Sequence, residues 1–176
     1  MTNIDTSVKF VSINIALITI SDSRLENEDK SGNLLNDRIT TFGHFVKKRL
    51  IIKDNVELIK QTFLDLSSDP LIDIIISTGG TGLTGRDSTP EAVMAIADKT
   101  IDGFGELFRQ LSFNKIATST IQSRAIGAVV NHTYLFCLPG SPNACKDGWN
   151  DILQYQLDNR YRPCNLVEIM SRLDEK

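Results

Sequence analysis

The segment at residues 77–93, STGGTGLTGRDSTPEAV, places glycines, hydroxyl side chains and an Arg-Asp pair directly after an apolar run. Glycines let backbone N–H groups approach a ligand closely, and the N-terminus of a following helix favours anions. The Gly-Gly-Thr-Gly sequence at residues 79–82 and the helix start at TPEA therefore predict a phosphate-binding loop. Thr78 and Thr81 would add hydroxyl donors to this loop.

This glycine loop differs from the common nucleotide-binding motifs. It lacks the Gly-Lys-Ser/Thr of a Walker A motif, and its glycine spacing and place after the third strand do not fit a dinucleotide-binding motif. It carries Asp87 instead, and phosphoryl or nucleotidyl transfer commonly uses Mg²⁺ held by one or two carboxylates and phosphate oxygens. Arg86 could pair with Asp87 or with a phosphate. Alternatively, Asp87 simply caps the helix that follows.

A second loop at residues 134–146, YLFCLPGSPNACK, has the same form. An apolar strand-like run leads into a Pro-Gly-Ser-Pro turn and then into a helix start. Two such turns in one small domain predict two helix ends that face anions. The alternative is a Pro-Gly turn in which Ser141 only caps the helix.

The elements that would position these loops alternate along the chain. Apolar runs predict strands, and apolar residues at helical spacing predict helices. Strands are predicted at residues 13–21, 44–52, 71–77, 124–130 and 133–140, with a turn at Asn131-His132, and helices at residues 33–42, 56–66, 104–113 and 141–157. Asp54 or Asn55 could cap the second helix, and Ser88 with Glu91 could form a capping box on the helix after the glycine loop. The alternation predicts a three-layer α/β/α fold with a mostly parallel sheet, in which ligands bind beyond the carboxyl ends of strands.

The composition is that of one globular domain spanning residues 1–176, with residues 1–11 and 166–176 expected to be loosely packed termini. The formal net charge of −3 gives no support for a nucleic-acid partner. No apolar run is long enough for a membrane span, and the first residues do not fit a signal peptide. An odd number of cysteines without metal-ligand spacing predicts reduced thiols in a cytoplasmic protein. These cysteines are Cys137, Cys145 and Cys164.

Four segments together resemble the molybdenum cofactor biosynthesis MoaB/MogA family, which includes molybdopterin adenylyltransferases and the first domain of gephyrin-like proteins. They are ISTGGTGLTGRDSTPEAV at 76–93, GFGELFRQLSF at 103–113, TSTIQSRAIGAVV at 118–130 and FCLPGSPNACKDGWNDIL at 136–153. The tail resembles the MoaB branch in particular. The resemblance implies a molybdopterin-binding α/β fold that forms a homotrimer or homohexamer. It also implies Mg²⁺-dependent adenylylation of molybdopterin by ATP, which gives adenylyl-molybdopterin and pyrophosphate, and a partner protein that inserts molybdenum.

The resemblance further implies roles for individual residues. Asp87 falls on a functional carboxylate that would hold Mg²⁺ directly or through water, and Asp54 falls on a second functional acid. Contacts with the nucleotide or the pterin are implied for Ser21, Asp22, Asp29, Ser31, Gly79, Gly80, Thr81, Gly82, Ser123, Arg124, Pro139, Gly140 and Ser141. From the residues alone, Asp29 could equally be a solvated loop charge and Arg124 a surface cation.

Some MoaB-branch members keep the fold without demonstrable adenylyl transfer. The alternative function is therefore a non-catalytic molybdopterin-binding protein of the same pathway. Two further alternatives are nucleotide hydrolysis, as suggested by the related CinA-type domain, and a scaffolding role.

Overall fold

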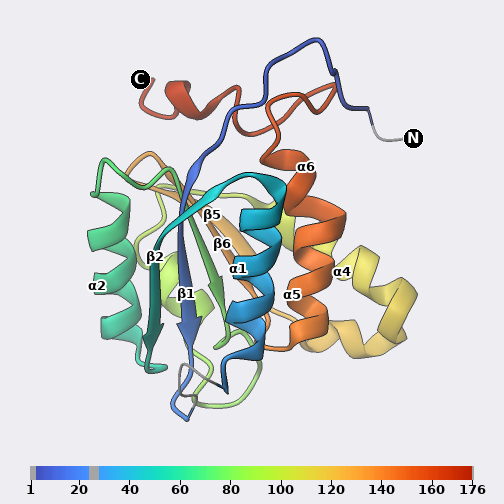
Figure 1. Ribbon diagram of the computed structural model, residues 1–176. Coiled ribbons are helices and arrows are strands. Elements are labelled where there is room, and N and C mark those ends of the chain that lie inside the picture. The colour runs from blue at the N-terminus through green and yellow to red at the C-terminus, as the bar shows by residue number, and fades with distance from the viewer. Residues whose placement is uncertain (1–2, 24–27, 176) are drawn as a thin grey trace.

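A six-stranded sheet forms the centre of the computed structural model, which describes residues 3–23 and 28–175. The strands are β1 (Asn14–Ile20), β2 (Phe45–Ile52), β3 (Ile74–Thr78), β4 (Lys99–Thr100), β5 (Ile126–Val130) and β6 (Thr133–Leu138). Their order is β2-β1-β3-β6-β5-β4. The first four strands in this order are parallel, whereas β5 pairs antiparallel with both β6 and β4. The carboxyl ends of the parallel strands therefore meet at one edge (Figure 1).

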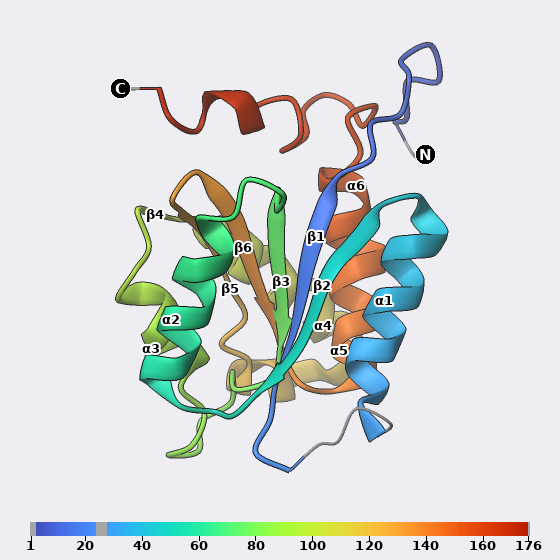
Figure 2. The ribbon, with the colours of Figure 1, turned by 60° about the vertical axis from the view of Figure 1, so that its left-hand side comes forward.

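Helices cover both faces of this sheet, which confirms the predicted three-layer α/β/α fold (Figure 2). Helices α1, α4 and α5 pack on one face, and α2 and α3 pack on the other. The helices are α1 (Lys30–Phe42), α2 (Val56–Ser67), α3 (Thr89–Met94), α4 (Asp102–Ile116), α5 (Pro142–Gly148) and α6 (Gln154–Gln156). On β1, Leu17 packs with the first group and Ile18 with the second, because successive side chains of a strand point to opposite faces. Burial on both faces explains why the strands are nearly uninterrupted apolar runs.

Local signals account for several of the element ends. Gly43 ends α1 with a φ of 108°, a left-handed conformation that glycine adopts without strain. Asn55, and not Asp54, caps α2, because its side chain accepts a hydrogen bond from the N–H of Leu58. Asn131 and His132 both have positive φ and form the predicted turn between β5 and β6.

Three features differ from the predicted elements. Helix α4 is longer at both ends and continues into the 3₁₀ helix η2 (Ala117–Gln122). The single helix predicted at residues 141–157 is divided into α5, a π-helical turn η3 (Trp149–Leu153) and α6. A one-turn π segment changes the apolar spacing too little to be recognised in a sequence. Strand β4 has two residues and was not predicted, since so short an edge strand has no periodicity.

The N-terminal and C-terminal segments both lie beyond the end of the sheet that is remote from the glycine loop (Figure 1). Ile4 forms an antiparallel bridge with Tyr161, and the Asn159 side chain hydrogen-bonds the backbone of Lys9 and Val11. Near the C-terminus is the short 3₁₀ helix η4 (Met170–Arg172). Within the described residues, no helix is long and apolar enough to cross a membrane.

Candidate functional site

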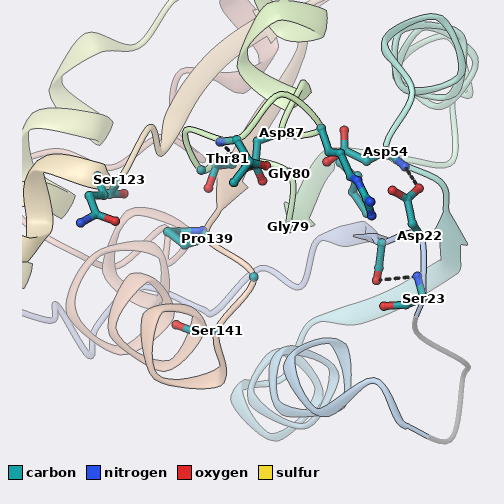
Figure 3. A pocket seen from close by; sticks show the side chains of 17 residues that line it. Asp22, Ser23, Asp54, Gly79, Gly80, Thr81, Asp87, Ser123, Pro139 and Ser141 are labelled. Carbon is teal, nitrogen blue, oxygen red and sulfur yellow. Dashed lines mark hydrogen bonds between the residues drawn. The ribbon is translucent and has the colours of Figure 1, made fainter.

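A cavity of about 500 Å³ lies at the edge where the parallel strands end (Figure 3). Its walls come from the segments after β1, β2, β3 and β6 and from the residues just before β5. The lining residues are Ile20, Ser21, Asp22, Ser23, Asp54, Gly79, Gly80, Thr81, Gly82, Thr84, Arg86, Asp87, Gln122, Ser123, Pro139, Gly140 and Ser141. Most of the residues predicted from the sequence to bind ligand are therefore gathered around one cavity.

The first glycines of the loop are required by its geometry. Gly79 and Gly80 have φ values of 104° and 64°, a region that other residues enter only with strain. A Cβ atom on Gly79 would lie 2.1 Å from the carbonyl oxygen of Ile20. Among the described residues, no acceptor is found for the N–H groups of Gly80 and Thr81. The loop thus places two successive backbone donors at the cavity wall, which suits an anionic ligand.

Asp54 joins the glycine loop to the segment after β2. Its Oδ1 accepts hydrogen bonds from the hydroxyl of Ser88 at 2.6 Å and from the N–H of Ser88 at 3.2 Å. Its own N–H donates to Oδ1 of Asp22 at 3.1 Å. Its Oδ2 would lie 2.7 Å from a Cβ atom on Gly80. The carboxylate is therefore held directly against the glycine loop, which no local sequence signal indicated.

Asp87 lies farther along the same loop, and its carboxylate accepts hydrogen bonds from another loop residue, Thr84. Oδ2 accepts hydrogen bonds from the N–H of Thr84 at 2.9 Å and from its hydroxyl at 2.6 Å. Partial burial raises the pKa of Asp87, but the hydrogen bonds from Thr84 and Gly82 and the charge of Arg124 together lower it below its usual value. Asp87 does not cap α3, because Ser88 occupies that position. It is a charged group at neutral pH beside the cavity.

Thr84 was not among the predicted site residues, although the Thr-x-x-Asp spacing is typical of a local turn closed by side-chain hydrogen bonds.

Arg86 also lines the cavity. Of the two partners predicted for Arg86, Asp87 forms no ion pair with it within the described part of the chain, and a phosphate partner stays a prediction.

The acids at the cavity suit a Mg²⁺ ion that is bound mainly through substrate phosphates. Within residues 3–23 and 28–175, no group of three or more His, Cys, Asp or Glu side chains could hold a metal by itself. Mg²⁺ typically takes one or two carboxylates together with phosphate oxygens and waters. Asp54 and Asp87 supply two carboxylates on either side of the glycine loop (Figure 3).

At both helix starts predicted to face an anion, protein groups take up part of the backbone donors. At the start of α3, the N–H groups of Ser88 and Thr89 already donate to Asp54 and to the carbonyl of Gly80. The predicted capping box is absent too, because the Ser88 side chain binds Asp54 and makes no cap hydrogen bond. At the start of α5, the Ser141 hydroxyl accepts from the N–H of Ala144. Protein groups thus accept several of the donors at these two helix starts, whereas no acceptor is found among the described residues for the N–H groups of Gly80 and Thr81.

Thr78 was expected to offer its hydroxyl to a ligand, and the structure contradicts this. The side chain is fully buried and donates to the carbonyl of Pro139 at 2.9 Å. It ties the glycine loop to the loop after β6.

Three residues predicted to contact the nucleotide or pterin lie outside the cavity walls. Asp29 is buried, where it caps α1 and pairs with Arg49 at 3.1 Å, so it is not a solvated loop charge. Ser31 donates to the carbonyl of Gly140 at 2.8 Å and so supports the loop after β6. Arg124 contacts the glycine loop from the side away from the cavity. Ser31 and Arg124 thus contact loops of the site without lining the cavity, whereas Asp29 supports the start of α1.

The fold and the site define an α/β domain with a glycine loop and two acids beside it at the ends of its parallel strands. Residues 16–159 match the family described as a probable molybdopterin binding domain. The chain belongs to this family, and its resemblance to MoaB/MogA proteins is confirmed.

Relatives of known name agree with this assignment. Molybdenum cofactor biosynthesis protein B of Escherichia coli (strain K12) is 44% identical over 160 residues, which cover 90% of this chain and 94% of the relative. The protein of the same name from Bacillus cereus is 42% identical over 142 residues, or 80% of this chain and 84% of the relative.

The fold of this chain is also similar to solved structures of cofactor biosynthesis proteins. A crystal structure of molybdenum cofactor biosynthesis protein B has a TM-score of 0.84 at 37% identity and covers 94% of this chain and 98% of its own. The tungsten cofactor synthesizing protein MoaB from Pyrococcus furiosus has a TM-score of 0.73 at 29% identity and covers 93% and 98%.

Proposed function

We propose that this protein transfers the adenylyl group of ATP to molybdopterin in a Mg²⁺-dependent reaction that releases pyrophosphate. Its family belongs to molybdenum cofactor biosynthesis. The observation that carries the proposal is the placement of Asp54 beside Gly80 and of Asp87 beside Gly82 in one cavity. This cavity is also lined by Arg86 and by two backbone N–H groups for which the described residues offer no acceptor. This is the charge pattern that a nucleotide triphosphate and a second phosphate would need.

In this reaction, a phosphate oxygen of molybdopterin attacks the α-phosphorus of ATP. A new P–O bond forms, the bond between the α-phosphorus and the bridging oxygen breaks, and pyrophosphate leaves with that oxygen. The attacking oxygen is already anionic, so no protein nucleophile is required. Catalysis would therefore depend on alignment and on charge neutralisation.

Different residues would provide this alignment and charge neutralisation. The N–H groups of Gly80 and Thr81 would hold a phosphate, and Arg86 would balance the charge of the departing pyrophosphate. Asp54 and Asp87 would hold Mg²⁺. When bound, the ion supplies Lewis-acid neutralisation of phosphate charge. The hydrogen bonds from Thr84 and Ser88 keep the two carboxylates in place.

The direct test replaces Asp87 in the purified protein and measures pyrophosphate released from ATP, Mg²⁺ and molybdopterin. Asp87→Asn keeps the shape of the side chain but removes its charge, so we expect turnover to fall ~10²-fold or more, with pterin binding retained. Asp65→Asn, on the exposed side of α2, is the matched control and should behave like the parent. Equal turnover in Asp87→Asn and the parent would contradict the assignment.

A second candidate is a protein that binds molybdopterin without reacting it. The observation in its favour is the lack, among the described residues, of a metal site complete without substrate. Calorimetry with ATP and Mg²⁺ separates the two candidates. Tight pterin binding without nucleotide binding would favour the binding protein, and pyrophosphate release that depends on molybdopterin would exclude both it and simple nucleotide hydrolysis.

The expected setting and assembly belong to the same proposal. No disulfide joins Cys137, Cys145 and Cys164 within the described residues, which supports a cytoplasmic location. Exposed apolar side chains on α4 and η2 support association into a homotrimer or homohexamer. The adenylylated product would pass to a protein that inserts the metal.

A further inference from the structure

The guanidinium group of Arg124 binds the backbone of the glycine loop at two places, Gly82 and Asp87. Its Nε–H donates to the carbonyl of Gly82 at 2.7 Å, and Nη2 donates to the carbonyl of Asp87 at 2.8 Å. The backbone N–H of Arg124 also donates to the carbonyl of Thr81 at 3.2 Å. One residue thus fixes the beginning and the end of the segment that carries the Asp87 carboxylate.

Glu91 holds Arg124 in this position. It lies in the first turn of α3, and its carboxylate accepts a hydrogen bond from Nη1 of Arg124. The planar guanidinium therefore makes three directed contacts, two with backbone carbonyls and one with a carboxylate. The fork geometry of arginine suits such an arrangement, whereas the single ammonium of lysine does not.

Arg124 acts from outside the cavity. It lines a neighbouring hollow with Arg109 and Glu106, while the adjacent residue Ser123 lines the candidate site itself. Arg124 therefore joins two walls of the site, the glycine loop and the segment before β5.

The other side-chain hydrogen bonds that hold the loop do not connect it to the segment before β5. The Asp87 carboxylate binds Thr84 within the loop, and Asp54 holds Ser88, which follows the loop. Without Arg124, the carbonyls of Gly82 and Asp87 would lose their charged partner. The loop would then be free to shift relative to Ser123.

We propose that Arg124, held by Glu91, is a positioning residue that sets the glycine loop and the Asp87 carboxylate for the adenylyl transfer proposed above. This inference rests on that proposed function for its kinetic effect, but the ordering of the loop is a separate physical consequence. Misplacement of a reacting group by about 1 Å can reduce a rate ~10²-fold. Arg124 therefore affects turnover more than substrate affinity.

The test compares Arg124→Ala, Arg124→Lys and Glu91→Gln with the parent. For Arg124→Ala we expect kcat to fall ~10–100-fold with KM for ATP changed less than ~3-fold. Arg124→Lys keeps the charge but not the fork, and should recover only part of the loss. Glu91→Gln should lower kcat less, and combining it with Arg124→Ala should add little, because the two residues act as one unit. Arg172→Ala is the control, since this arginine pairs with Glu175 at the remote end of the molecule.

Hydrogen exchange measured by mass spectrometry gives the readout that does not need activity. In Arg124→Ala, amides of residues 81–90 should exchange ~10-fold faster or more, while those of β3 keep the parent rate. Unchanged exchange in this segment in both Arg124 variants would overturn the inference, as would a raised KM with unchanged kcat, which marks direct substrate contact. If the parent shows no adenylyl transfer, the proposed function fails and the exchange experiment alone decides the positioning role. If Arg124→Ala does not fold, Arg124→Lys and Glu91→Gln give the same comparison.

Discussion

His44 lies in the core just before β2, where the rings of Phe10, Phe42 and Trp149 surround it. Its Nδ1 accepts a hydrogen bond from the N–H of Ile13. Burial lowers the pKa of His44 to about 4, although the nearby charge of Asp158 acts in the opposite direction. In the folded protein this histidine is therefore neutral at pH 7, and it remains neutral at pH 5.

This lowered pKa makes stability dependent on pH. Between pH 6.5 and pH 4 the unfolded chain binds a proton at His44 that the folded protein does not, so stability is lost as the pH falls through this range. We expect the His44 contribution to lower the free energy of unfolding by roughly 1–2 kcal/mol between pH 7 and pH 5. In His44→Asn, which keeps an acceptor for Ile13, the loss between these two pH values should be smaller by that amount.

Urea unfolding followed by Trp149 fluorescence at pH 7 and pH 5 measures this difference. His132 is exposed in the turn between β5 and β6, and Asn tolerates its positive φ. His132→Asn is therefore the matched control and should keep the parent's pH dependence. An identical pH dependence in His44→Asn and the parent would show that His44 does not cause it.

Within one element, the glycine loop, Gly80 and Gly85 differ in whether a side chain could be accommodated. A Cβ atom on Gly80, at a φ of 64°, would lie 2.3 Å from Oγ1 of Thr89 and 2.7 Å from Oδ2 of Asp54. A Cβ atom on Gly85 would meet nothing within 4 Å. We expect Gly80→Ala to lower the free energy of unfolding by about 1–3 kcal/mol and turnover by ~10²-fold, because it displaces Asp54. Gly85→Ala should change stability by less than ~0.5 kcal/mol.

Chemical denaturation and the pyrophosphate assay on the two variants decide this prediction. Equal losses in Gly80→Ala and Gly85→Ala would mean that the loop tolerates no added side chain at all, independent of backbone conformation.

The elements that could be predicted from the sequence are those with a local signal. Strand β1 is buried on both faces and so reads as an apolar run, and Gly43 marks the end of α1. The pairing of Asp54 with Ser88 could not be predicted, because it joins residues 34 positions apart through the sheet topology. The predicted capping box failed for the same reason, since a carboxylate from another segment took the Ser88 hydroxyl. The family resemblance thus implied that Asp54 and Asp87 belong to one site. Only the structure shows the hydrogen bonds that hold them there.

At the scale of the whole molecule, one outer region is unusually apolar. The side chains of Phe113, Ile116 and Ile121, on α4 and η2, are 55%, 53% and 80% exposed. This segment lies to one side of the sheet, away from α2 and the termini (Figure 1). Apolar surface gathered in this way commonly marks a contact between proteins. Most oligomers of this kind are symmetric assemblies of one chain, so a homo-oligomer is the assembly we expect.

The oligomer can be tested by light scattering during size-exclusion chromatography of the parent and two aspartate variants. We expect the parent to elute as a trimer or hexamer, and Ile121→Asp to shift it toward the monomer, because a charge buried in an apolar contact lacks a partner. Leu71 is 67% exposed before β3, so Leu71→Asp is a control of similar exposure and chemistry that should leave the oligomer intact. A monomeric parent, or an Ile121→Asp protein of unchanged mass, would show that this surface does not form the subunit contact.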